Sequence, residues 1–200
     1  MFTSSKWDIL KIISGEKKSP LELARLANTS MANVSQQLRL LEFAGIVKSE
    51  RISNRDKGKP RVLYSLAKDT SYLITVAKGF VQKKFVALDD HHESILRIWY
   101  LPNEQMHYFV EKAFWKAESY LQKIDAMYLE DTEAKDPTII VCSKDASLGK
   151  ALTDFSVKHP DTNITKTVKF KIIDEAQRMK NKNLYAIYSR SKKYLGEVIK

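Results

Sequence analysis

The chain has 200 residues, of which 44% are hydrophobic and 10% aromatic, so it can form two domains with buried cores and is not a disordered chain. Its single cysteine, Cys142, excludes a disulfide framework, a thiolate zinc finger and a CxxC redox centre. No apolar run approaches the ~18 residues of a membrane span, and the N-terminus lacks the apolar core of a signal peptide. We therefore expect a cytoplasmic protein that does not contact a membrane.

The formal net charge of +10 favours an anionic partner, and it is unevenly distributed. Residues 1–88 carry 16 basic and 7 acidic side chains, residues 89–136 carry 5 and 11, and residues 137–200 carry 13 and 6. The best linker candidate is the polar stretch at 130–137, which closes on a proline.

The first seventy residues predict three helices followed by a hairpin. An apolar stripe of helical period begins at Trp7 and ends near Gly15. Ser19 then begins a second helix as an N-cap within an S-x-x-E capping box, and Ser30 is placed to cap a third helix that stops at Gly45. The β-like runs 46–52 and 62–66 flank a loop rich in turn residues and cations.

This order of elements is a winged helix-turn-helix, and specific motifs support it. The motifs are LELA in the second helix, NVSQQLRLLE in the third, AGIV leading into the hairpin, and KGKPRVLYSLAKD in the wing. Over residues 5–69 the chain resembles the ArsR-type family of transcription regulators, and its archaeal branch most. The resemblance implies a DNA-binding domain at 1–69, a recognition helix at 31–44 and a wing at 53–61.

The recognition helix presents residue types that read bases. If Val34, Leu38 and Leu41 face the core, the opposite face carries amides and Arg39, which can form bidentate hydrogen bonds with adenine and guanine in the major groove. The wing cations would contact phosphates or the minor groove. Solvated polar side chains are the alternative for any single position. The predicted DNA-binding residues are Ser30, Ala32, Asn33, Ser35, Gln36, Gln37, Arg39, Arg55, Lys57, Lys59 and Arg61.

Residues 70–136 predict a hairpin and a long helix that together form a dimerisation segment. Two β-rich runs, 72–77 and 80–88, surround Lys78-Gly79, and the longest helical pattern covers 103–130. Apolar residues in this helix recur at spacings of 4, 3, 4, 3, 4 and 3, as in a coiled-coil seam. The seam forms either a homodimer interface, which we favour, or a contact within the same chain. Its members are Met106, Val110, Ala113, Ala117, Tyr120, Ile124 and Met127.

A histidine pair at His91 and His92 opens another predicted helix, with acidic neighbours that complement its N-terminal dipole. A transition-metal site that includes His107 is one interpretation. Solvated first-turn residues are the other, and it is the one we favour. We therefore expect no metal and no cofactor.

Residues 137–200 predict a small α/β domain. Strands are expected at 138–143, 165–173 and 184–188, and helices at 145–158, 174–182 and 192–199, which favours a mostly parallel sheet. Hydroxyls and a cation follow two of the strands, at 143–147 and 189–191, where an anion could bind a helix N-terminus. Ordinary helix capping is the alternative that we favour.

The sequence thus predicts an α+β protein with an N-terminal winged helix-turn-helix, a long connecting or dimerisation helix and a C-terminal sensing or oligomerisation domain. We expect a homodimeric transcription regulator specific for double-stranded DNA, with a possible small-molecule effector in the C-terminal domain. No P-loop, HExxH, GxSxG or GxGxxG pattern occurs, so we expect no enzymatic activity. The alternatives are a winged-helix module for protein–protein contacts and a regulator with a degenerate nucleotide-handling domain.

Overall fold

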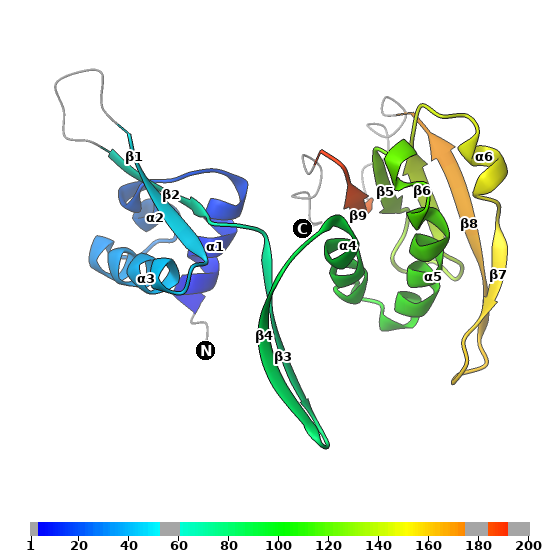
Figure 1. Cartoon of the computed structure of the whole chain (residues 1–200), viewed down its shortest axis with the longest axis horizontal. Helices are drawn as coiled ribbons and strands as arrows, with labels where there is room; N and C mark the ends of the chain where they lie inside the picture. The colour runs from blue at the N-terminus through cyan, green and yellow to red at the C-terminus, as the bar shows by residue number, and fades with distance from the viewer. Residues whose placement is uncertain (1–3, 53–60, 175–183, 192–200) are drawn as a thin grey trace. The chain divides into compact units, whose positions relative to one another are not determined.

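The computed structural model describes residues 4–52, 61–174 and 184–191 (Figure 1). The chain forms two compact units, Met1–Leu88 and Asp89–Lys200, and each is described by itself. The dimerisation segment expected at 70–136 is therefore divided between them. Within the described residues, no helix has the length and apolar character needed to cross a bilayer.

Three helices form the core of the first unit: α1 (Ser4–Gly15), α2 (Pro20–Leu26) and α3 (Met31–Phe43). The predicted capping box is present, because the Ser19 side chain accepts the Glu22 N–H while the Glu22 carboxylate accepts the Ser19 N–H. Ser30 caps α3, as predicted. Gly45, with a φ of +69°, takes the left-handed conformation that ends this segment. The buried residues of this core are Ile9, Ile13, Leu23, Ala24, Val34, Leu38, Leu41 and Val47.

A two-stranded antiparallel sheet completes the winged helix-turn-helix. It consists of β1 (Val47–Ile52) and β2 (Arg61–Leu66). Backbone hydrogen bonds between Lys18 and Tyr64 connect the loop before α2 to β2. The predicted order of three helices and a hairpin is confirmed, whereas the wing residues Arg55, Lys57 and Lys59 lie outside the described residues.

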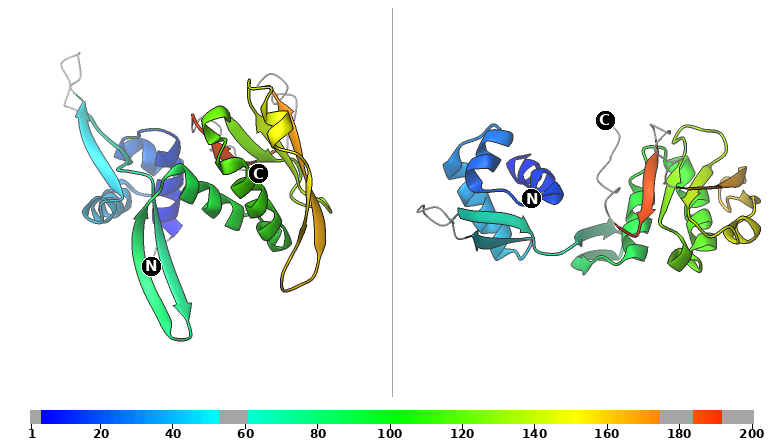
Figure 2. Two further views of the ribbon diagram at one scale, coloured as in Figure 1. Left: turned by 45° about the vertical axis from the view of Figure 1, so that its right-hand side comes forward. Right: turned by 90° about the horizontal axis from the view of Figure 1, so that it is seen from above.

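A second antiparallel hairpin follows, as the sequence predicted. Its strands are β3 (Thr70–Ala77) and β4 (Phe80–Ala87), and they form a two-stranded sheet separate from β1 and β2 (Figures 1 and 2). Gly79 has a φ of +77°, which suits the tight turn after Lys78. Most side chains of both strands are exposed.

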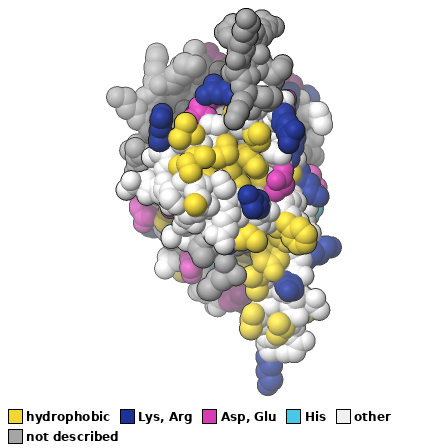
Figure 3. All heavy atoms as spheres, turned by 90° about the vertical axis from the view of Figure 1, so that its left-hand side faces the viewer, with side chains coloured by type: hydrophobic (Ala, Val, Ile, Leu, Met, Phe, Trp, Pro, Cys, Tyr) yellow, Lys and Arg dark blue, Asp and Glu magenta, His cyan; other side chains and the backbone are white. Residues whose placement is uncertain are grey.

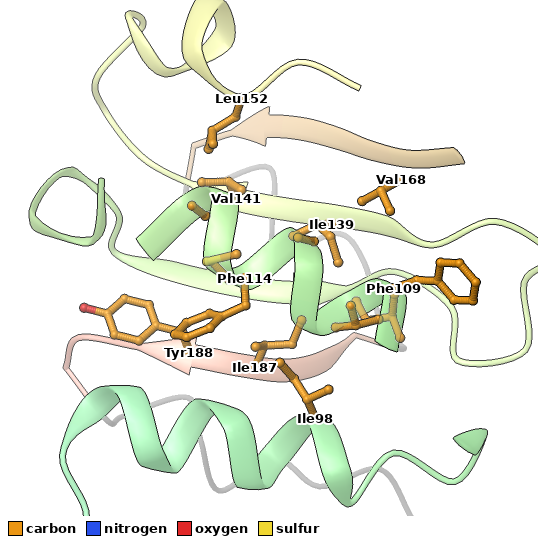
Figure 4. Packing of buried hydrophobic residues seen from close by; sticks show 14 of the residues in the cluster. Ile98, Phe109, Phe114, Ile139, Val141, Leu152, Val168, Ile187 and Tyr188 are labelled. Atoms are coloured by element: carbon orange, nitrogen blue, oxygen red, sulfur yellow. The ribbon is translucent and has the colours of Figure 1, made fainter. Parts of the chain in front are cut away.

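The second unit is a five-stranded sheet with the order β7-β8-β6-β5-β9. Its helices α4 and α5 pack on one face of this sheet (Figures 2 and 4). The elements in chain order are α4 (Asp90–Trp99), the short 3-10 helix η1 (Glu104–Met106), α5 (His107–Glu118), the 3-10 helix η2 (Leu121–Lys123), β5 (Ala126–Leu129), β6 (Thr138–Cys142), α6 (Leu148–Ala151), β7 (Phe155–Lys158), β8 (Thr165–Ile173) and β9 (Tyr185–Ser189).

The predicted mostly parallel sheet is wrong. Only β6 and β8 pair in parallel, and the other neighbours are antiparallel. The predicted strands β6 and β8 do pair in parallel, and the antiparallel pairs come from two strands that lie in segments expected to be helical. β5 inserts between β6 and β9, and β7, which follows the four-residue α6, pairs with β8 as an antiparallel hairpin. The helices expected at 174–182 and 192–199 lie outside the described residues, apart from Asp174.

The predicted long helix at 103–130 is also wrong. The helix α5 ends at Glu118, and the chain continues through η2 into β5, a strand between β6 and β9. Side chains of β5 are buried on both faces: Met127 and Leu129 pack under the helices, and Ala126 and Tyr128 belong to a separate buried cluster. A strand that is buried on both faces carries apolar residues at every position. For this reason β5 contains the last residue of the predicted seam, although it is a strand and not a helix.

The predicted dimer interface consequently lies inside the chain's own core. Six of its seven residues are fully buried, and Tyr120 packs partly buried against the same cluster. Their neighbours in this core include Ile98 of α4, Phe109 and Phe114 of α5, and Val141 of β6 (Figure 4). The intrachain alternative therefore holds for Met106, Val110, Ala113, Ala117, Tyr120, Ile124 and Met127.

An Ala113→Glu substitution tests this assignment. The side chain of Ala113 is 0% exposed, so the carboxylate would be buried without a partner and should destabilise the second unit by about 3–5 kcal/mol. Thermal unfolding followed by circular dichroism measures the loss. Gln122→Glu, which adds the same charge at an exposed site, should unfold like the wild type. An Ala113→Glu variant that keeps its stability but loses self-association would instead restore the seam as an interface between chains.

Candidate nucleic-acid interface

The exposed face of α3 gathers four of the predicted DNA-binding residues. Ala32, Ser35, Gln36 and Arg39, together with Leu40, line a surface hollow of about 390 Å³. The position of this face follows from packing, since the opposite side of α3 is anchored in the core. Leu40 was not among the predicted DNA-binding residues because it is apolar. It lies four residues after Gln36, so helical periodicity places it on the same face.

Three other predicted DNA-binding residues form hydrogen bonds within the chain. The Asn33 side-chain amide donates to the Thr29 hydroxyl at 2.9 Å, and its oxygen accepts a hydrogen bond from the Gln37 amide at 3.1 Å. The Ser30 hydroxyl accepts the Asn33 backbone N–H at 3.1 Å as the helix cap. A base contact by Asn33 or Gln37 would have to replace these bonds. By contrast, no hydrogen bond within the described residues holds the side chain of Gln36 or Arg39.

The end of α3 is linked to the strands that follow it. The Ser49 hydroxyl of β1 donates to the Glu42 carboxylate at 2.6 Å. Burial raises the pKa of the Tyr64 hydroxyl in β2, with a further contribution from the negative charge of Glu42 that the positive charge of Arg39 partly offsets. The hydrogen bond between Ser49 and Glu42 thus connects the end of α3 to β1.

Exposed cations continue from α3 onto the wing strands. Lys48 and Arg51 are exposed on β1, and Arg61 is exposed where β2 begins. Figure 3 views the molecule from the left-hand side of Figure 1. It shows hydrophobic side chains with Lys and Arg side chains around them. Arg61 is the only predicted wing contact within the described residues, so the geometry of the other three wing cations is not described.

Each of the three histidines considered for a metal site contacts a different partner within the chain. His91 Nδ1 lies 2.5 Å from the Glu118 carboxylate, His92 Nδ1 lies 2.6 Å from Asp89, and His107 Nε2 lies 2.9 Å from the Leu101 carbonyl. In the part of the chain that the structure describes, no three His, Cys, Asp or Glu side chains form a group able to hold a metal ion.

The loop after β6, one of the two anion candidates, is satisfied by its own residues. The Ser143 hydroxyl donates to the Lys123 carbonyl at 2.6 Å and accepts the Asp145 N–H at 3.0 Å. The Asp145 carboxylate accepts the Ser147 N–H at 2.8 Å and pairs with the Lys123 ammonium at 2.9 Å. The Asp145 carboxylate thus already binds a backbone N–H and the cation near this loop, whereas Ser147, the N-cap of α6, makes no side-chain capping hydrogen bond.

The loop after β9 is similarly engaged. The Arg190 guanidinium donates to the Leu121 carbonyl at 2.8 Å and lies 3.8 Å from the Asp125 carboxylate. Ser189 is buried. The cation that could have attracted an anion therefore contacts the chain's own acceptors.

Asp145 should give the second unit an acid-sensitive contribution to stability. Hydrogen bonds from Ser147 and then from Lys123 lower the pKa of Asp145 to about 2 from an ordinary 3.8. A lowered pKa stabilises the folded state above pH 3.8, and this contribution disappears as the pH falls toward 2. The difference in denaturant midpoint between the wild type and Asp145→Asn should therefore be largest above pH 4 and shrink in acid.

Asp161→Asn, a charge loss in an exposed turn, is the control for a general effect of acid. A gap between the wild type and Asp145→Asn that stays constant from pH 6 to pH 2 would show that the Asp145 charge contributes nothing to stability.

A match to a protein-family model agrees with the architecture of the first unit. A family model described as a helix-turn-helix domain matches residues 8–50, which extend from α1 to β1. The crystal structure of ZitR from Lactococcus lactis, a zinc-responsive MarR family member, is 30% identical, with a TM-score of 0.30. That match covers 33% of this chain and 44% of the ZitR chain. A search of curated proteins gives no match. The first unit therefore contains a helix-turn-helix domain.

Proposed function

We propose that this protein is a transcription regulator that binds double-stranded DNA with sequence preference, in the manner of ArsR-type regulators. The observation that carries the proposal is the exposed face of α3, where Gln36 and Arg39 stand beside Ala32 and Ser35 in one hollow. α3 is the second helix of the helix-turn-helix, and that helix enters the major groove in proteins of this type. Gln suits adenine, Arg suits guanine, and the small Ala32 side chain permits close approach to a thymine methyl group.

The wing has a separate role in this proposal. Arg55, Lys57, Lys59 and Arg61 contact phosphates or the adjacent minor groove, so they position α3 without reading the major groove. The support is the basic composition of residues 1–88, with 16 basic and 7 acidic side chains, and the exposed start of β2 at Arg61.

We also propose that the protein acts as a homodimer. A single winged helix-turn-helix has a small footprint, whereas two copies related by a two-fold axis read two half-sites about 34 Å apart and add their phosphate contacts. The second unit serves assembly or the sensing of an effector rather than catalysis. An effector would bind away from the loop after β6, since that loop is satisfied by the chain's own groups, whereas the Ser189 hydroxyl at the end of β9 is buried without a hydrogen-bond partner among the described residues.

Arg39→Ala should weaken binding to a preferred site by about 1–3 kcal/mol and relax base preference at one position. Binding-site selection from random duplexes followed by fluorescence anisotropy measures both effects. Arg39→Lys is the matched control because it keeps the charge but loses the bidentate geometry, so it should also lose base preference while keeping affinity for random DNA. If Arg39→Ala loses the same amount of affinity for preferred and for random DNA, then Arg39 contacts only phosphate.

If the wild type does not bind duplex DNA at low salt, the proposal fails. The exposed face of α3 would then serve a protein contact, as the alternative of a winged-helix interaction module requires.

Neutralising the four wing cations to Gln should weaken binding to all sequences alike. Each lost phosphate contact should reduce the slope of log K against log salt by about one unit. Titrations of the wild type and the quadruple variant between 50 and 300 mM salt give the two slopes. An unchanged slope would remove the wing from the interface, whereas a selective loss on preferred DNA would make it a base reader.

A further inference from the structure

The β3–β4 hairpin has two chemically different faces. Directly paired residues share a face, and the faces alternate along each strand. Tyr72 pairs with Phe85, Ile74 with Lys83, and Val76 with Val81, and these three pairs lie on one face. We call these six residues the apolar face. The opposite face mixes polar and apolar residues in equal number: Ser71, Val86, Leu73, Lys84, Thr75, Gln82, Ala77 and Phe80.

Among the described residues of the first unit, the apolar face is left exposed. The side chains of Val76, Val81 and Ile74 are 78%, 68% and 64% exposed. Figure 3 shows hydrophobic side chains continuing down the hairpin, which forms the lowest part of the molecule in that view. The Tyr72 and Phe85 rings stack at 4.5 Å between centroids, so the aromatic pair is preformed and presents a flat π surface.

An uncovered hairpin of this kind is unfavourable by itself. A two-stranded sheet is marginally stable in water, and it gains stability when an apolar face packs against another element. A contiguous exposed apolar patch on a folded protein marks a contact surface. Among the described residues of the first unit, no element covers this face, so a partner for it would come from outside that unit.

We propose that the apolar face packs against the same face of a second copy of this chain, about a two-fold axis. With the two hairpins antiparallel, the pair Ile74–Lys83 of one copy lies over the pair Tyr72–Phe85 of the other, and the reverse contact forms by symmetry. Lys83, the only charged residue of the face, then meets the partner's aromatic rings, where a cation is attracted. The pair Val76–Val81 covers the small residues Thr70 and Ala87.

Charge favours this occupant over nucleic acid. Residues 70–88 contain three lysines and no acidic residue. However, Lys83 and Lys84 lie on opposite faces and Lys78 lies in the turn, so the cations do not form one surface for a phosphate backbone. The apolar face carries one cation among five uncharged side chains, all aliphatic or aromatic, which suits a face of the same composition.

The proposal names the interface of the homodimer proposed above and rests on that function only for its effect on DNA. Its test is self-association measured without DNA, so that a failure of this interface and a failure of DNA binding are separate results. The variants are Ile74→Lys, which places a second lysine opposite Lys83, and Leu73→Lys, which places one opposite Lys84. The two variants have the same charge change and the same cross-strand repulsion on adjacent pairs, but on opposite faces.

Sedimentation velocity of the full chain over a range of micromolar concentrations should show a dimer for the wild type and for Leu73→Lys. Ile74→Lys should raise the dimer dissociation constant at least about 30-fold, as expected for a central interface residue. Circular dichroism should be unchanged in both variants. Ile74→Lys should also lose affinity for a duplex with two half-sites while keeping its affinity for a single half-site.

Three results would overturn the proposal. The first is a monomeric wild type, and the second is a dimer that Ile74→Lys leaves intact. The third is equal dissociation in both lysine variants, since this would show that the face carries no specificity. A monomeric wild type whose single-half-site affinity falls in Ile74→Lys would assign the hairpin to DNA instead. A stable dimer that fails to bind any duplex would retain this interface and remove the proposed function.

Discussion

The burial of one stripe of α3 determines the orientation of everything else in the first unit. Val34, Leu38 and Leu41 are anchored between α1, α2 and β1, and this anchoring leaves Gln36 and Arg39 on the opposite side. Because a helix is rigid over its few turns, fixing one face fixes the other. The same core holds the start of β1, and the Lys18–Tyr64 bridge connects β2 to the helices. The exposed face of α3 is therefore a consequence of the packing beneath it.

Hydrogen bonding divides the remaining polar residues into two groups. Asn33, Ser143 and Asp145 satisfy neighbouring groups of the chain, and their geometry is that of caps and turns. A buried or half-buried polar group needs such a partner, because leaving it unsatisfied is costly. Gln36 and Arg39 belong to the other group, since they are exposed on the helix surface. This division narrows the candidate interface to the side chains that remain available to an external ligand.

The two units differ in how far their apolar side chains are buried. In the second unit, α4 and α5 cover one face of the sheet, and the stripe of Val110, Ala113 and Ala117 on α5 is buried in that core. In the first unit, the β3–β4 hairpin leaves aliphatic and aromatic side chains exposed on one face. The surface that we propose for self-association therefore lies on the hairpin rather than on the helix whose spacing resembled a coiled coil.

The sequence by itself determined the first unit, because its signals are local. The Ser19 capping box, the Ser30 cap, the 3.6-residue period of α3 and the turn at Lys78-Gly79 each depend on a few adjacent residues, and all appear as predicted. In the second unit, tertiary structure determined which apolar segments became strands. Met127 and Phe155 continue helical spacings but lie in strands, since a strand's pairing depends on partners far away in the chain. Likewise, only the tertiary structure could show that the apolar residues of α5 around Ala113 pack on the sheet of the same chain. Burial within a chain and burial between chains require the same apolar residues, so the sequence pattern is identical in both cases.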